Sequence, residues 1–149
     1  MSTDKGALVD AVLAGIGRTV ERGMRMNQTA AARLGINATD MQCLQLLQYG
    51  PRTSSELAKL IGMTTASMTA LIDRLEKAGF VTRVRDEHDR RRVLVHIALD
   101  RARGDIAPIF GPLIGGWRRS LDGYTVQELA VISDFLNRVE RGFDAELGD

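Results

Sequence analysis

The chain has 149 residues, of which 44% are hydrophobic and 26% charged, a composition typical of a globular protein with one domain or two small lobes. No run approaches the roughly 18 consecutive apolar residues of a membrane span, and the single cysteine, Cys43, excludes an internal disulfide and fits a reducing cytoplasm. The net charge is +1, but residues 52–98 carry nine basic and six acidic groups, a modest excess that permits nucleic-acid binding without demonstrating it.

The first predicted element is a long helix over residues 5–33. This stretch contains Asp10 and follows Asp4, and it lacks a basic leading segment, so we expect a helix and not a signal peptide. Its apolar side chains recur at helical spacing on one side of the helix: Leu8, Val12, Leu13, Ile16 and Val20.

Three later helix starts match the capping box, S/T-x-x-E/Q. They are TDMQ at residues 39–42, TSSE at 53–56 and TVQE at 125–128. In this box the Thr hydroxyl accepts a hydrogen bond from the third helical amide, and the Glu or Gln returns one to the cap. The first box predicts a helix over residues 40–49, with Met41, Leu44 and Leu47 inward. The second predicts a short helix over 54–61, with Leu57, Leu60 and Ile61 inward and Gly62 as its stop.

Thr64 predicts another N-cap, for a helix that runs to Ala78 and ends at Gly79. Met68, Leu71, Ile72 and Leu75 form its inward stripe. Two β-like runs follow, Val81 to Arg85 and Val93 to Ala98, with a charged loop between them, and the alternation on the second run continues to Leu99. This order of elements predicts a winged helix-turn-helix: a short helix, a tight turn, a longer helix and then a two-stranded ribbon.

The C-terminal third is predicted to be helical. A helix over residues 101–120 should be interrupted or bent near Pro108 and Pro112. The last helix carries a narrow, coiled-coil-like seam that is too apolar to leave in water, so we expect it to form a dimer interface with the first helix; packing inside a single subunit is the alternative. The predicted interface residues are Leu8, Val12, Leu129, Ile132, Leu136, Val139 and Phe143.

The loop between the two β-like runs is unusually charged. Residues 83–92 contain five arginines and three carboxylates. Arg90, Arg91 and Arg92 can reach phosphates, and one guanidinium can enter a narrow minor groove. Bare arginines would repel one another, so we expect Asp86 or Asp89 to pair bidentately with one of them and hold the loop in shape. The alternative is a solvated hairpin whose exposed ion pairs contribute little.

The outer face of the helix before the loop is made of small and polar residues, including Ala66 and Asp73. Such a face suits close approach to a major groove, although a merely solvated face is the alternative. The predicted DNA contacts on this helix and its cap are Thr64, Thr65, Ser67, Thr69, Ala70 and Arg74.

The stretch TSSELAKLIGMTTASMTALIDRLEKAGFVTRVRDEHDRRRVLVHIALD resembles the core of the MarR family (multiple antibiotic resistance regulators). The motifs that carry the resemblance are ELA, DRLEKAGFV and the wing pattern RxRDxxDRRxxxVxI. The long helices expected before and after this stretch also match the layout of the family. The resemblance implies a mainly α fold, with a winged helix-turn-helix lobe and two-stranded β-wing over residues 37–99 and a helical dimerisation region over 1–36 and 100–149. It also implies a homodimeric transcription regulator that binds a pseudo-palindromic operator in double-stranded DNA. Most members of the family act as repressors, so we expect a repressor here.

Within this resemblance, Asp89 braces the wing and Arg91 is the minor-groove arginine, ahead of Arg90. The chain departs from the family pattern at two positions. Many members carry a basic residue where Ala70 stands, and the wing often reads Asp-Pro where this chain has Asp86 and Glu87. Both departures bear on operator sequence and not on DNA binding itself.

The sequence indicates an effector site less clearly than it indicates DNA binding. Many members release DNA when a small ligand, often aromatic or phenolic, binds between the lobes, and Met24, Met41 and Trp117 are the candidate lining residues. A helix N-terminus could lower the pKa of Cys43 and make it a redox sensor, but a lone thiol is more often a core residue. No cofactor, metal site, catalytic grouping or membrane association is expected. The alternative function is a winged-helix protein-interaction module without DNA binding.

Overall fold

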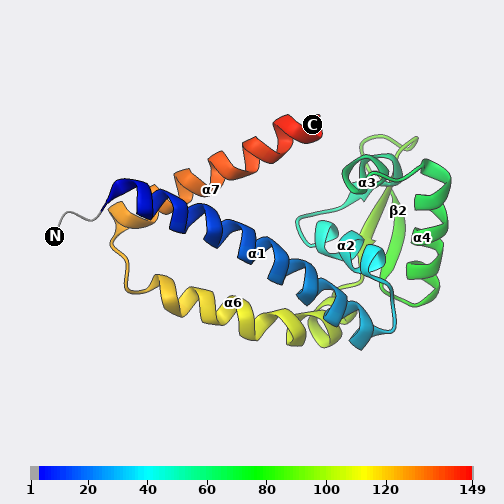
Figure 1. The fold of residues 1–149 in the computed structure, drawn as a ribbon. Coiled ribbons are helices and arrows are strands. Elements are labelled where there is room, and N and C mark those ends of the chain that lie inside the picture. The colour runs from blue at the N-terminus through cyan, green and yellow to red at the C-terminus, as the bar shows by residue number, and fades with distance from the viewer. Residues whose placement is uncertain (1–3, 149) are drawn as a thin grey trace. The chain divides into compact units, whose positions relative to one another are not determined.

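The structure is a computed structural model that describes residues 4–148 (Figure 1). Contacts divide the chain into two compact units, one that runs to Ile109 and one that begins at Phe110. No helix among the described residues is long and apolar enough to cross a membrane. The elements of the first unit are α1 (Lys5–Leu34), α2 (Ala38–Leu47), β1 (Arg52–Thr53), α3 (Ser54–Ile61), α4 (Thr65–Lys77), β2 (Val81–Arg85), β3 (Val93–Ile97), α5 (Leu99–Arg101) and the π-helix η1 (Ala102–Ile106).

Two of the three expected capping boxes are confirmed. Thr53 accepts from the Glu56 amide at 3.2 Å and the Glu56 carboxylate accepts from the Thr53 amide at 2.9 Å, so α3 begins where the sequence predicts. The box of Thr125 is equally complete and begins α7 (Val126–Leu147).

The box expected at Thr39 is wrong. The cap of α2 is Asn37, whose side chain accepts from the Asp40 amide at 2.7 Å, while the Asp40 carboxylate accepts from the Asn37 amide at 3.3 Å. Asn caps as well as Thr does, and the shorter Asp side chain still reaches the cap, so the helix begins at Ala38 and ends at Leu47.

The wing belongs to a three-stranded antiparallel sheet in the order β1-β3-β2. The ribbon of β2 and β3 is confirmed, with Val81 opposite Ile97 and Arg85 opposite Val93. The third strand, β1, was not predicted, because two residues leave no periodicity to detect; Arg52 pairs with Val95 across it. Leu99 was expected on the ribbon but begins α5 and is 65% exposed.

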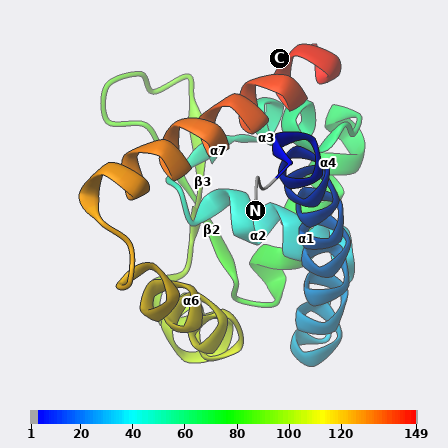
Figure 2. The ribbon, with the colours of Figure 1, turned by 60° about the vertical axis from the view of Figure 1, so that its left-hand side comes forward.

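The core of the winged-helix lobe gathers under α4. The predicted inward stripe of α4 is confirmed, since all four side chains are buried and α4 packs against α3 and β2. Helix α2 contacts both α1 and β3 and contributes Met41, Leu44 and Leu47 (Figure 2). Leu60, expected to point inward, is instead 40% exposed, because Ala58 fills the buried position next to Leu57 on this short helix.

The helix expected over residues 101–120 is present with a change of pitch. It runs from α5 through η1 into α6 (Ala107–Leu121), and the π turns end just before Pro108. A proline has no amide hydrogen to donate to the preceding turn, and a local π segment is one way for a helix to accommodate that loss. Pro112 lies inside α6. In the second unit, none of the described residues of α7 is buried.

Candidate nucleic-acid interface

Helix α4 presents a small, hydroxyl-rich surface at its N-terminus. Thr64 caps the helix, because its Oγ1 accepts from the Ser67 amide at 3.2 Å and donates to Ser67 Oγ at 2.9 Å. Thr69 Oγ1 donates to the Thr65 carbonyl at 3.0 Å. The exposed side chains here include Thr65, Ser67, Thr69 and Ala70, all expected to face DNA. A helix N-terminus with unpaired amides attracts phosphate, and small side chains allow close approach to it.

Arg74, also predicted to contact DNA, is held within the lobe. Its Nη2 lies 2.9 Å from Asp40 Oδ1, and the side chains are 54% and 6% exposed. Because Asp40 is also the second member of the capping box of α2, this ion pair joins the start of α2 to α4. The sequence offered no sign of the pair, since the two residues lie 34 positions apart.

A second set of ion pairs joins α4 to the first strand of the wing. Arg83 on β2 lies 2.6 Å from Asp73 Oδ1 and 2.9 Å from Glu76 Oε1, and its amide donates to Glu76 Oε2 at 3.2 Å. Asp73 and Glu76 are three residues apart, so they lie on one face of the helix and receive the guanidinium together. Asp73, expected on the outer face, therefore lies on the side of α4 that meets the wing.

The wing loop is braced, but not by the bidentate pair that we expected. Asp86 Oδ1 accepts from the His88 amide at 2.9 Å, and Asp89 Oδ1 accepts from the Arg91 amide at 3.0 Å. The hydrogen bond from His88 holds the pKa of Asp86 below its usual value, and the charge of Arg92, 3.7 Å away, lowers this pKa further. Carboxylates accept from backbone amides here, which closes the loop without using an arginine fork.

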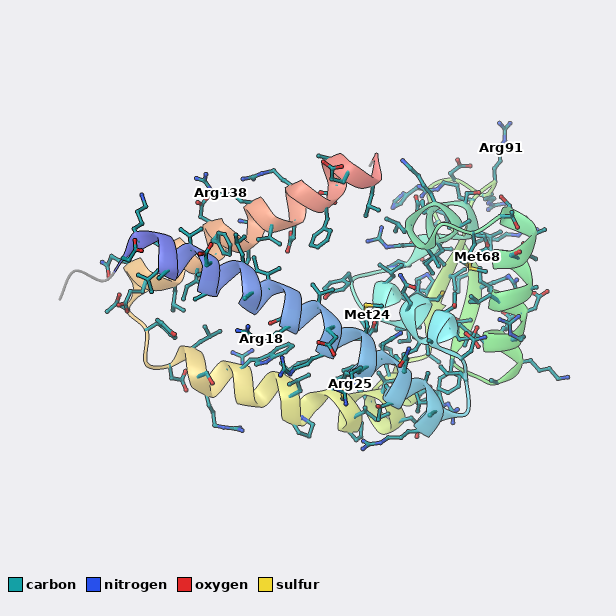
Figure 3. All side chains as sticks on the ribbon, viewed as in Figure 1. Arg18, Met24, Arg25, Met68, Arg91 and Arg138 are labelled. Atoms are coloured by element: carbon teal, nitrogen blue, oxygen red, sulfur yellow. The ribbon has the colours of Figure 1, made fainter. Side chains whose placement is uncertain are left out.

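The three arginines of the tip differ in their contacts. Arg92 reaches Glu56 Oε1 at 3.2 Å, so it ties the wing to the start of α3. Arg90 and Arg91 are exposed and form no ion pair with any residue between 4 and 148. Figure 3 shows Arg91 extending outward from the tip. Two cations are therefore available to a phosphate backbone, while the third holds the wing in place.

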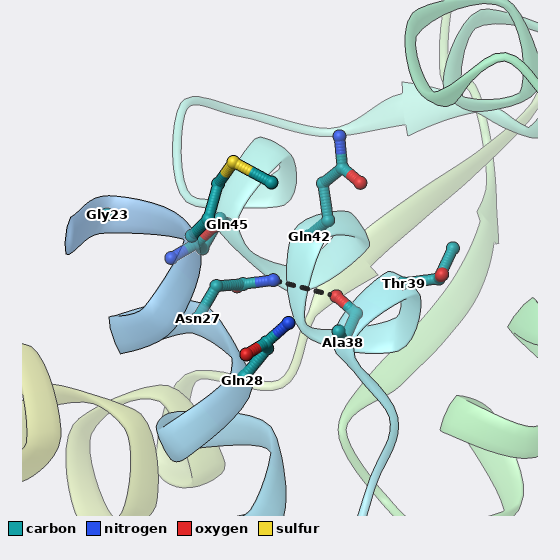
Figure 4. A pocket seen from close by; sticks show the side chains of 8 residues that line it. Gly23, Asn27, Gln28, Ala38, Thr39, Gln42 and Gln45 are labelled. Carbon is teal, nitrogen blue, oxygen red and sulfur yellow. Dashed lines mark hydrogen bonds between the residues drawn. The ribbon is translucent and has the colours of Figure 1, made fainter. Parts of the chain in front are cut away.

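A cleft of about 420 Å³ lies between α1 and α2 in the first unit (Figure 4). Of the candidate lining residues, Met24 lines this cleft, whereas Met41 does not, because it is fully buried in the core. Trp117 belongs to the second unit and is 56% exposed. Apart from Gly23 and Ala38, the other lining residues are polar and uncharged: Asn27, Gln28, Thr39, Gln42 and Gln45. Asn27 Nδ2 donates to the Ala38 carbonyl at 2.9 Å, whereas its buried Oδ1 has no partner among the described residues.

Cys43 is a core residue. Its side chain is fully buried, and burial, with a smaller contribution from the Asp40 carboxylate, raises its pKa to about 12. The expectation that this lone thiol is a core residue is confirmed, and the alternative of a pKa lowered by the helix N-terminus is not. A thiol that stays protonated and inaccessible is a poor nucleophile, which removes the physical basis for a redox sensor at this position.

Comparison with known proteins agrees with this geometry. Residues 36–93 match the sequence profile of the MarR family. An HTH-type transcriptional regulator of Bacillus subtilis (strain 168), YcgE, is 39% identical over 127 residues, which cover 85% of this chain and 82% of the relative.

Two solved structures share the fold. A MarR family protein from Bacillus stearothermophilus superposes with a TM-score of 0.61 at 23% identity, covering 96% of this chain and 98% of that one. Wild-type MarR from E. coli, in its apo form, superposes with a TM-score of 0.55 at 21% identity, covering 93% and 98%.

Proposed function

This chain belongs to the MarR family and is a DNA-binding transcription regulator, and from that premise we propose that it is a homodimeric repressor of a pseudo-palindromic operator. A protein-interaction module would keep the winged helix but would not need the exposed arginines of the wing. The regulator acts by binding and not by catalysis, and we place it in the cytoplasm, where its operator lies.

The observation that carries the proposal is the pair of exposed arginines on a braced wing. Arg90 and Arg91 lie on a loop in which Asp86 and Asp89 accept from backbone amides, and Arg92 is tied to Glu56. A loop that is already ordered loses little conformational entropy when it binds DNA. Most of the interaction free energy of the two arginines with phosphates or a narrow minor groove can therefore contribute to affinity.

Dimerisation is supported by apolar side chains that a single chain leaves in water. On α7, Leu136 is 53% and Phe143 50% exposed, while Leu129, Ile132 and Val139 are half-buried. On α1, Leu8 is 54% and Val12 48% exposed. We propose that these residues form the two-fold interface, within a dimerisation region of residues 1–36 and 100–149. A dimer would present two copies of α4, the proposed recognition helix, about one DNA turn, ~34 Å, apart.

The cleft between α1 and α2 is the proposed effector site. Met24 offers an apolar surface and the neighbouring amides offer hydrogen bonds, a combination that suits a small aromatic molecule with polar substituents. The Asn27 bond to the Ala38 carbonyl connects this cleft to the start of α2, and Asp40 connects the start of α2 to the recognition helix. A ligand that moves Ala38 would therefore act on Arg74.

The test is a fluorescence-anisotropy titration of the dimer against DNA upstream of its own gene, at two salt concentrations. Arg91→Ala should weaken binding roughly tenfold and reduce the slope of log affinity against log salt by about 1. Arg138→Ala is the matched control, because Arg138 is an exposed arginine outside the winged helix and pairs with Asp134. If Arg91→Ala and Arg138→Ala bind alike, the wing is not a DNA contact.

A further inference from the structure

The recognition helix lacks the side chains that usually read bases by paired hydrogen bonds. Arg and Lys read guanine, and Asn and Gln read adenine, through two hydrogen bonds each. None of these residues, and no Asp, Glu or His, occurs from Gly62 to Ile72, which covers the turn and the first two turns of α4. This part of α4 therefore cannot recognise a base through a bidentate hydrogen-bonded contact.

The next long polar side chains on the helix are already engaged. Asp73 pairs with Arg83 at 2.6 Å, and Arg74 pairs with the buried Asp40 at 2.9 Å. Moving Arg74 to a base edge would leave the Asp40 carboxylate buried without its cation, which is unfavourable. The two ion pairs therefore keep these residues away from the bases.

Besides the exposed hydroxyl groups of Thr65 and Ser67, the surface that remains carries a face of methyl groups. Ala66, Thr69 and Ala70 are exposed and stand at positions i, i+3 and i+4, so they share one face. The Thr69 hydroxyl gives its only hydrogen to the Thr65 carbonyl at 3.0 Å, so it cannot also donate to a base. On the floor of the major groove, the 5-methyl group of thymine is the apolar feature that distinguishes one base from the others.

We propose that α4 reads its operator through thymine methyl groups, which pack against the methyl face of Ala66, Thr69 and Ala70. The inference rests on the DNA binding described above and adds the class of sequence that is preferred: half-sites with thymine where they meet the start of α4. Each contact buries apolar surface on both partners and requires no hydrogen bond from the helix.

Deoxyuridine tests the proposal directly, because it pairs like thymine and lacks only the methyl group. High-affinity duplexes are first selected with the full-length protein from a randomised library. Replacing each half-site thymine with deoxyuridine should weaken binding roughly fourfold per contacted methyl group, the factor expected for one methylene-sized group. The same replacement in the flanking sequence should have no effect.

A second comparison assigns the effect to the helix. Ala70→Gly should weaken binding to the thymine duplex more than to the deoxyuridine duplex, because only the thymine duplex loses a contact between methyl groups. The destabilisation of the helix by glycine is the same for both duplexes and cancels in the comparison. Ala130→Gly, at an exposed position on α7, should show no such difference.

The outcomes are distinct. Selected half-sites without thymine, or equal affinity for thymine and deoxyuridine duplexes, would overturn the proposal while DNA binding stands. A protein that selects no duplex at all would instead overturn the operator-binding function, and this proposal with it.

Discussion

Replacing Arg74 with methionine should destabilise the winged-helix lobe more than replacing Asp40 with asparagine does. The two side chains form a 2.9 Å ion pair in which Asp40 is 6% and Arg74 54% exposed. Losing Arg74 leaves a carboxylate inside the protein without its cation, and among residues 4–148 only the Asn37 amide still donates to it. Losing the charge of Asp40 leaves a guanidinium that water can already reach.

The magnitudes follow from this asymmetry. Breaking a fully buried pair costs about 3–5 kcal/mol and an exposed one about 0–1 kcal/mol. Solvent reaches half of Arg74, so we expect about 2 kcal/mol for Arg74→Met and about 1 kcal/mol for Asp40→Asn. Urea unfolding followed by circular dichroism measures both, and the double variant yields the coupling energy between them.

The exposed pair of Arg138 and Asp134 on α7 is the matched control. Its N–O distance is 2.8 Å, nearly the same, but its side chains are 68% and 57% exposed. Its coupling energy should be no more than about 0.5 kcal/mol. Equal costs for Arg74→Met and Asp40→Asn, or a coupling no larger than that of the control pair, would refute the argument from burial.

Three further predictions concern the core, a helix cap and the buried thiol. Leu71→Ala, at a fully buried position on α4, should cost about 2–5 kcal/mol in urea unfolding; a cost below 1 kcal/mol would contradict its place in the core. Thr53→Ala removes the cap of α3 and should cost about 1 kcal/mol, and Thr53→Ser, which keeps the hydroxyl, should recover most of it. Burial raises the pKa of Cys43 from 9.0 to about 12, so the folded state holds this proton more tightly than the unfolded state. Wild type should therefore lose stability relative to Cys43→Ala as pH rises from 9 toward 12, by at most ~1.4 kcal/mol per pH unit; parallel profiles would place the thiol in solvent.

Local features of the fold could be predicted from the sequence because they depend on neighbouring residues. The caps at Thr53, Thr64 and Thr125 and the stop at Gly62, with its φ of 76°, each need only a few consecutive positions. The stripe of α4 follows from helical periodicity. The failures are also local in origin: Asn37 and Asp40 form a box outside the usual S/T-x-x-E/Q pattern, and β1 is too short to show a pattern.

The tertiary structure decided which charged residues form ion pairs within the protein and which remain free to contact DNA. The sequence placed arginines in the wing and on α4, but Arg74 and Arg92 find partners 34 and 36 positions away, and Arg83 is held by two acids of α4. Which arginine stays available for DNA depends on which carboxylates come within about 4 Å after helices α2, α3 and α4 pack together. An ion pair is a matter of distance in space, and no pattern along the chain specifies that distance when dozens of residues separate the partners.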